Sequence, residues 1–193
     1  MRACLVVNLA WMIFFTASGL AAEPDESKLS GFAPFIGTWA FTDQFLAENE
    51  WAKDFHAEVL EWGAKKNIVR MRETAHKTDR NRVVFEGFAY WHPSENRLKY
   101  VGYNVQERFF FDGEIVELGP SHMIKQYKVF YPPGYAHGAY SEIKGNVREY
   151  RGERRLLDAS TLELTTLMKI GGQWARWPTP DAKPFVIRKL AEE

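Results

Sequence analysis

Between residues 35 and 190, short runs rich in β-branched and aromatic residues follow one another, separated by clusters of Gly, Pro, Asn, Asp and Ser. Several runs alternate between apolar and polar residues, which is the period expected when one face of a sheet is buried. The clearest is residues 161–170, where every second residue from Leu162 to Ile170 belongs to the less polar set. No segment carries a sustained apolar stripe of helical period. The pattern therefore predicts an all-β domain of sequential antiparallel strands.

Turn signals divide this region into the strands that we expect. Asp112-Gly113 predicts a tight hairpin because this dipeptide tolerates positive φ, and Gly171-Gly172 predicts a second one. A closed barrel removes the exposed edges that so many strands would otherwise present, so we predict an antiparallel barrel of about 8–10 strands, with a sandwich as the alternative. The runs that we expect to be strands are residues 37–46, 55–62, 67–76, 82–92, 97–106, 108–111, 114–118, 122–131, 140–151, 161–170, 173–177 and 185–190.

The N-terminus has the order of a secretory signal peptide, in which a charge, an apolar run and small residues follow one another. Arg2 supplies the charge and residues 5–15 the apolar run, and the small residues are Ala17, Ser18, Gly19, Ala21 and Ala22. The apolar run is shorter than the roughly 20 residues that a membrane anchor, the alternative, would need. We predict cleavage after Ala22, with Ala21 as the next choice. The mature protein would then be periplasmic or secreted and would have no transmembrane segment.

The expected organisation is a signal peptide at residues 1–22, a linker or short helix at residues 23–34 and a barrel domain at residues 35–193. The only Cys, Cys4, lies in the predicted signal, so the mature domain must be held by its core and not by disulfides. The chain has 25 basic and 25 acidic side chains and lacks the positive excess of a nucleic-acid-binding protein. No nucleophile elbow, phosphate loop, zinc signature or dinucleotide fingerprint is present.

The most specific feature of the sequence is the segment that opens the first predicted strand. Residues 34–39 read Pro-Phe-Ile-Gly-Thr-Trp. A Gly-x-Trp at this place, ahead of a series of antiparallel strands, resembles the lipocalin-like barrels of the calycin superfamily, and especially their small exported bacterial members. The resemblance covers most of residues 35–190 in strand order, although only Gly37-Thr38-Trp39 is motif-like. It implies that Trp39 packs across the closed end of the barrel, with Arg188 against its ring in a cation–π contact.

A barrel of this size is either filled by side chains or holds one small ligand. We predict that it binds a small, partly apolar molecule without catalysis. Glu86 with Arg70 or Arg72 is a candidate polar anchor for a ligand head group, whereas the alternative places these residues in salt bridges on the outer surface of the sheet. The candidate wall residues, for which ordinary core packing is the alternative, are Phe85, Trp91, Tyr100, Tyr103 and Tyr127.

Other functions remain open at this stage. An enzyme, such as an isomerase, cyclase or hydrolase, would use Glu86, His92 or a nearby Arg and would need a buried ionisable cluster in the barrel. A haem-binding barrel would use His137 or His122. His76, His92 and His122 lie at predicted strand ends, where they would rim a barrel mouth or be solvated. No pair of histidines has the spacing of a helical metal-binding motif. We expect no metal or cofactor, with haem as the minor alternative.

Overall fold

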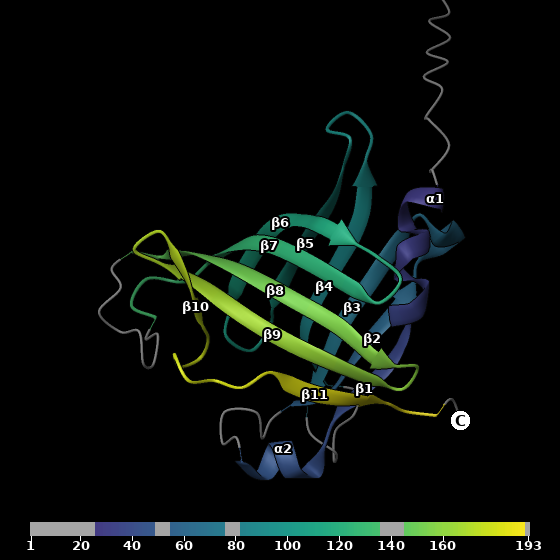
Figure 1. The fold of residues 1–193 in the computed structure, drawn as a ribbon. Coiled ribbons are helices and arrows are strands. Elements are labelled where there is room, and N and C mark those ends of the chain that lie inside the picture. The colour runs from purple at the N-terminus through teal and green to yellow at the C-terminus, as the bar shows by residue number, and fades with distance from the viewer. Residues whose placement is uncertain (1–25, 49–54, 76–81, 136–144, 192–193) are drawn as a thin grey trace, which may run out of the picture.

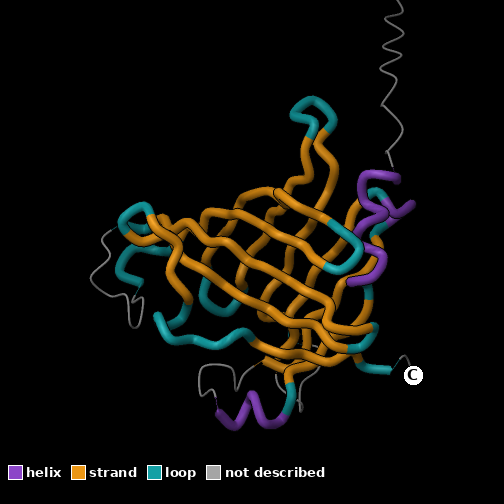
Figure 2. Tube along the Cα trace, in the orientation of Figure 1, coloured by secondary structure: helices purple, strands orange, loops and turns teal. Residues whose placement is uncertain are grey.

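The computed structural model describes residues 26–48, 55–75, 82–135 and 145–191. The predicted signal peptide, His76 and His137 lie outside these ranges. Strands make up most of the described chain, as the tube in Figure 2 shows. No helix among the described residues is long and apolar enough to cross a membrane.

Ten antiparallel strands close into a barrel, which confirms the predicted fold class (Figure 1). From β1 to β9 each strand pairs with its neighbour in sequence, and β11 closes the ring between β9 and β1. The ring strands are β1 (Gly37–Phe41), β2 (Phe55–Trp62), β3 (Ile68–Ala75), β4 (Val83–His92), β5 (Arg97–Asn104), β6 (Phe109–Leu118), β7 (His122–Phe130), β8 (Val147–Asp158), β9 (Thr161–Ile170) and β11 (Phe185–Lys189).

One edge of β9 serves two partners. Residues 161–164 pair with β11, whereas residues 167–170 pair with β10 (Gln173–Arg176). The predicted hairpin at Gly171-Gly172 is confirmed, with φ values of 57° and 85° at the two glycines. β10 therefore extends the sheet at one end of the barrel, outside the ring of ten strands.

Helical turns close the other end of the barrel. α1 (Glu26–Leu29) and η1 (Ser30–Phe35) place Leu29, Phe32 and Phe35 in the core, each at most 1% exposed. Trp39 is fully buried beside them, and its Nε1 donates a hydrogen bond to the Phe35 carbonyl oxygen at 2.8 Å. In Figure 1 these turns and β10 lie at opposite sides of the molecule. The end nearest α1 and η1 is called the closed end below.

The cation over the Trp39 ring is Lys189, and the assignment to Arg188 is wrong. Lys189 Nζ lies 5.5 Å from the ring centroid, whereas Arg188 is exposed. The register explains the difference, because Trp39 lies opposite Lys189 and Ala40 lies opposite Arg188. Successive side chains of a strand point to opposite faces, so only one of the two cations can face the interior.

The predicted first strand is too long. It ends at Phe41, and α2 (Asp43–Glu48) follows. Thr42 starts this helix, since its Oγ1 accepts a hydrogen bond from the Phe45 amide at 3.2 Å and its carbonyl accepts one from the Leu46 amide. A Thr followed by Asp is a helix-start signal, and here it overrides the apolar pattern. A shorter helical turn, η3 (Ala64–Lys66), joins β2 to β3.

The hairpin predicted at Asp112-Gly113 is also wrong, because β6 runs without a turn through both residues. A Cβ on Gly113 would lie 2.1 Å from the Gln126 carbonyl oxygen and 2.5 Å from the Tyr127 Cα. Gly113 therefore permits a close approach of β7 and has no role in a turn. An Asp-Gly dipeptide is therefore compatible with a hairpin turn and with the interior of a strand, and the local sequence does not distinguish the two.

Candidate functional site

The half of the barrel away from the closed end holds a cavity of about 340 Å³. Six charged residues line it together with a wall of aromatic rings. Glu107 is hydrogen-bonded to Tyr135 and Glu153 is paired with Arg151, whereas the side chains that interact electrostatically with one another are Glu58, Glu73, Lys125 and Arg154. We call these four residues the polar cluster. Glu58 pairs with Trp39 across β1 and β2, and Arg154 pairs with the core residue Met123 across β7 and β8. The polar cluster therefore lies where the filled core ends and the cavity begins.

Strand alternation brings each charged residue inside. Glu58 has the same parity as buried Leu60, and Glu73 has that of Met71. Lys125 and Arg154 likewise follow the inward positions of β7 and β8. Because a period of two fixes the face, these side chains point inward despite the free-energy cost of removing a charge from water.

Glu58 and Arg154 form a buried ion pair between Oε1 and Nη2. The residues are 4% and 5% exposed. The second terminal nitrogen of Arg154, Nη1, is buried without an acceptor among the described residues. An unsatisfied buried donor costs about 1–3 kcal/mol, and more when it is charged. The site therefore contains a cationic donor that the described part of the protein does not satisfy.

Glu73 lies directly opposite Glu58 on the neighbouring strand. Its carboxyl group has no hydrogen bond or ion pair with any residue that the structure describes. Burial raises the pKa of Glu73 to about 7, and the negative charge of Glu58 acts in the same direction, whereas Lys125 and Arg154 oppose it. Of two adjacent carboxylates, the one that lacks a partner takes the raised pKa.

Lys125 lies over the aromatic wall. Its Nζ donates a hydrogen bond to Tyr100 Oη at 3.0 Å and lies 4.4 Å from the centroid of the same ring. Burial lowers the pKa of Lys125 to about 7, and Arg154 lowers it further, whereas Glu58 and Glu73 raise it. Gly152 faces Lys125 across the strands, and a Cβ there would lie 2.8 Å from Lys125 Cε. The glycine thus leaves room for the lysine side chain.

Five tyrosines and five phenylalanines line the cavity, and the tyrosines add hydroxyl groups to its wall. Tyr127 stacks on Tyr150 with ring centroids 5.7 Å apart, and the edge of Tyr100 meets Tyr127 at 5.6 Å. The hydroxyls of Tyr131 and Tyr150 are hydrogen-bonded at 2.8 Å. Burial is the main reason that the pKa values of these four tyrosines lie above the usual range, so their hydroxyls stay protonated near neutral pH. The wall therefore offers apolar faces and neutral hydroxyls.

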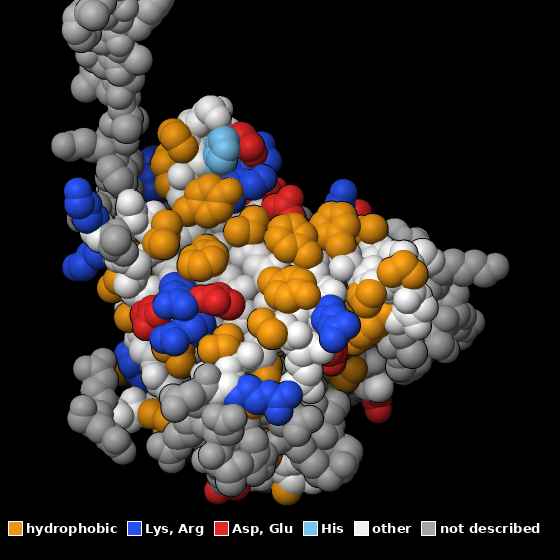
Figure 3. Space-filling view, turned by 180° about the vertical axis from the view of Figure 1, so that it is seen from behind, with side chains coloured by type: hydrophobic (Ala, Val, Ile, Leu, Met, Phe, Trp, Pro, Cys, Tyr) orange, Lys and Arg blue, Asp and Glu red, His pale blue; other side chains and the backbone are white. Residues whose placement is uncertain are grey.

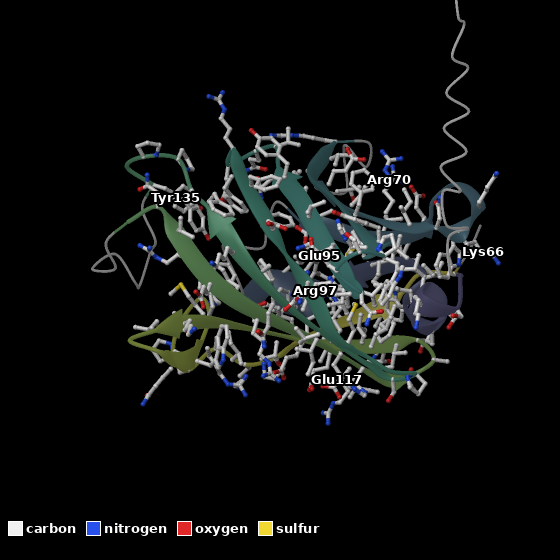
Figure 4. The ribbon with its side chains drawn as sticks, turned by 90° about the horizontal axis from the view of Figure 1, so that it is seen from above. Lys66, Arg70, Glu95, Arg97, Glu117 and Tyr135 are labelled. Carbon is white, nitrogen blue, oxygen red and sulfur yellow. The ribbon has the colours of Figure 1, made fainter. Side chains whose placement is uncertain are left out.

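The mouth is also aromatic. Tyr135 stacks on Tyr131 at 4.5 Å and donates a hydrogen bond from its hydroxyl to Glu107. Trp177, which follows β10, meets the face of Tyr150 edge-on at 6.2 Å. Figure 4 shows Tyr135 at one end of the barrel and Lys66, in the β2–β3 turn, at the other. A ligand entering from this side would pass aromatic rings before it reached the polar cluster.

Comparison of the chain with protein-family models and with curated proteins found no match. The closed antiparallel barrel is compatible with the lipocalin-like architecture that the sequence resembles.

Three of the five predicted wall residues, Phe85, Tyr100 and Tyr127, line the cavity. Trp91 has the same inward parity as Phe85 but lies near the closed end, where it borders an outer groove with Lys28 Nζ 5.1 Å from its ring. Tyr103 is on the outer face and is 43% exposed, because it has the opposite parity to Tyr100. Trp91 and Tyr103 therefore do not contribute to this cavity.

The predicted polar anchor lies on the outer surface. Arg70 Nε is 2.6 Å from Glu86 Oε1, and Arg72 Nη2 is 3.0 Å from Glu61. These ion pairs match the salt-bridged alternative, and none of their four residues lines the cavity. Figure 4 shows Arg70 at the side of the barrel, apart from Tyr135. Figure 3 shows that charged groups on the rear outer surface lie among exposed hydrophobic side chains.

His92 and His122, the two candidate histidines within the described residues, lie away from the cavity. His92 is near Ser94 and Glu95 at the end of β4, and His122 contacts Glu117 at 2.7 Å. Both strand ends are at the closed end, so these histidines do not rim the mouth. Among the described residues, no group of three or more His, Cys, Asp or Glu is placed to hold a metal ion.

Proposed function

We propose that the barrel binds one small amphipathic molecule with an acidic head group. The observation that carries this proposal is the buried Nη1 of Arg154, which lacks an acceptor among the described residues in the lining of a cavity. A carboxylate, sulfonate or phosphate oxygen would supply that acceptor in a charge-assisted hydrogen bond. Lys125, whose described hydrogen bond is to a neutral hydroxyl, is the second cation within the site.

The rest of the ligand would be apolar, and the volume of the cavity limits its size. A volume of about 340 Å³ is at the small end of the range for ligand pockets. Tyr100, Tyr127 and Tyr150 offer ring faces to such a body, and their hydroxyls offer neutral hydrogen bonds. The geometry supports a flat or aromatic molecule whose acidic end points toward the polar cluster.

We further propose that the chain is a lipocalin-like protein exported to the periplasm or the exterior. The Gly37-Thr38-Trp39 opening and the closed antiparallel barrel support the first part. The charged, apolar and small segments of residues 1–22 support the second. Expression in a bacterial host should yield an exported protein whose N-terminal sequence begins at Glu23. Retention of the intact N-terminus in the cytoplasm would contradict export.

Two fluorescent probes with a similar aromatic body test the binding proposal. 8-Anilinonaphthalene-1-sulfonate carries an acidic group, and N-phenyl-1-naphthylamine does not. We expect saturable binding of the sulfonate at one site, and weaker binding of the neutral probe. The charge-assisted contact should favour the sulfonate by about tenfold or more. No saturable binding of either probe would contradict the proposed function.

A matched pair of double variants locates the site. Glu58→Gln/Arg154→Met removes the inner ion pair without leaving one buried charge alone, and should abolish the preference for the sulfonate. Glu86→Gln/Arg70→Met removes an outer pair and should leave the preference unchanged. Equal effects of the two variants would show that the probes bind elsewhere.

A further inference from the structure

We infer that Glu73 is a general base that removes a proton from a carbon acid bound in the cavity, while Arg154 and Lys125 stabilise the negative charge that develops on the substrate. This inference rests on the proposed function, because a molecule must first occupy the cavity. It goes beyond binding, and it departs from the non-catalytic role expected from the sequence.

The two carboxyl groups of the polar cluster have different surroundings. Glu58 is tied to Arg154 by the buried ion pair, whereas Glu73, directly across the strands, has no partner among the described residues. A carboxylate that is committed to an arginine is a poor base, and one without hydrogen-bond donors retains its basicity. The geometry therefore assigns the structural role to Glu58 and leaves Glu73 available to a substrate.

The cationic groups complete the arrangement. Arg154 Nη1 lacks an acceptor, and the described hydrogen bond of Lys125 Nζ goes to the neutral hydroxyl of Tyr100. Donors held in place before the reaction stabilise an oxyanion without reorganisation, and they act strongly where water is excluded. One unpartnered carboxyl group and two cationic donors in one aromatic cavity are the parts that proton abstraction beside a developing oxyanion requires.

The protonation equilibria agree with this geometry. The groups that act on Glu73 are Glu58 from β2, Lys125 from β7 and Arg154 from β8, and burial together with these charges sets its pKa at about 7. Tyr100 and Tyr127 face the same cavity and stay neutral. The pKa of Lys125 is also about 7. Activity should therefore rise as Glu73 ionises and fall as Lys125 loses its proton, with a maximum near neutral pH.

5-Nitrobenzisoxazole is a suitable carbon acid for the test. The Glu73 carboxylate would take the proton from C3, and the electron pair of that C–H bond would form the second π bond of a nitrile. The N–O bond would break with its electron pair on oxygen, giving 2-cyano-4-nitrophenolate, whose negative charge Arg154 and Lys125 would stabilise. Glu73 would then release its proton to water. No oxidant, reductant or cofactor is needed.

We expect the purified protein to accelerate this reaction over buffer, with a bell-shaped pH profile. Glu73→Gln should lower kcat/KM by about 100-fold or more, which is the lower range for general-base catalysis. Glu86→Gln, a matched change on the outer surface, should have the wild-type rate. The naphthalene sulfonate probe should inhibit the wild-type protein competitively, which locates turnover in the cavity without any variant.

The outcomes separate this inference from the proposed function. Loss of turnover in Glu73→Gln with retained sulfonate binding supports the general base. Sulfonate binding without turnover in the wild-type protein, or wild-type turnover in Glu73→Gln, would overturn the inference and leave the binding proposal intact. Failure of the wild-type protein to bind the probe would overturn the proposed function itself.

Discussion

The two halves of the barrel interior are built from different side chains. At the closed end, Phe32, Phe35 and Trp39 are fully buried, and the Trp39 indole donates to a backbone carbonyl. In the half that holds the cavity, Glu73 has no described partner and Arg154 keeps a buried nitrogen without an acceptor. The buried indole N–H of the closed end therefore has an acceptor, whereas the cavity half keeps a carboxyl group and a guanidinium nitrogen without a described partner.

This difference separates stability from function within one sheet. Filling the closed end with close-packed apolar groups supplies the favourable free energy of folding. Buried charges without partners lower that free energy, and proteins tolerate them mainly where they serve a ligand or a reaction. Mutations in the closed half should therefore destabilise the fold, whereas some mutations in the cavity half should stabilise it.

The largest expected effect is at the closed end. Trp39→Ala should lower the free energy of unfolding by about 3–5 kcal/mol, because a fully buried indole is replaced by a cavity. Urea denaturation measures this change. Trp174→Ala, at a position that is 37% exposed on β10, is the control and should change stability by less than about 1 kcal/mol. Similar losses in the two variants would remove the distinction between the halves.

The inner ion pair should give the next largest effect. Arg154→Met or Glu58→Gln alone should lower the free energy of unfolding by about 3 kcal/mol, because each disrupts a buried charge pair. The double variant should recover most of this loss, since no buried charge then lacks its partner. A double-mutant cycle from urea denaturation measures the coupling. Additive losses would show that the pair is not shielded from water.

Much of the fold was predictable because strand alternation is a local signal. Residues 55–62, 161–170 and most other predicted runs are strands, and the Gly171-Gly172 turn is correct. The exceptions depend on contacts that local sequence does not show. Gly113 is a glycine because β7 approaches it, and α2 begins at Thr42 because side-chain capping competes with strand formation.

The site was less predictable, because inward and outward charged residues differ only in their phase relative to the apolar residues of the same strand. Lys125 shares the parity of Met123 and Tyr127, so alternation alone would have placed it inside. The prediction selected Glu86 and Arg70 instead, and these lie outside. The sequence signal for the polar cluster is a charged residue at the same alternating positions of a strand as its buried apolar residues. The pairing of Glu58 with Arg154, which are far apart in sequence, needed the closed barrel.

Replacing the unpartnered carboxyl group should stabilise the fold. The pKa of Glu73 rises from 4.5 to about 7 on folding, so the native state binds more protons than the unfolded state between these pH values. Stability from the neutral carboxyl group is then present below about pH 4.5 and lost as the pH rises through 7. Glu73→Gln should remove this loss and raise stability at pH 7.5 by about 1–3 kcal/mol relative to wild type.

Urea denaturation at several pH values provides the measurement for Glu73. The difference between Glu73→Gln and wild type should grow from pH 4.5 to 7 and level off above that range. Lys125 has the opposite dependence, because its lowered pKa makes native stability rise with pH above about 7. A difference that is constant with pH would show that Glu73 is solvated or paired, and the cavity half would then resemble the closed half.

The smallest expected effect concerns Lys189, the cation over the Trp39 ring at the closed end. Lys189→Met keeps an unbranched apolar side chain beside Gly37 but removes the charge over Trp39, and should cost about 0.5–1 kcal/mol in urea denaturation. Arg188→Met, on the outer face of the same strand, should have no effect. The reverse result would show that Arg188, and not Lys189, contacts the Trp39 ring. The register of β11 would then differ by one residue from the one described here. Such a shift would turn Phe185 and Ile187 out of the barrel, because a one-residue slip exchanges the two faces of a strand.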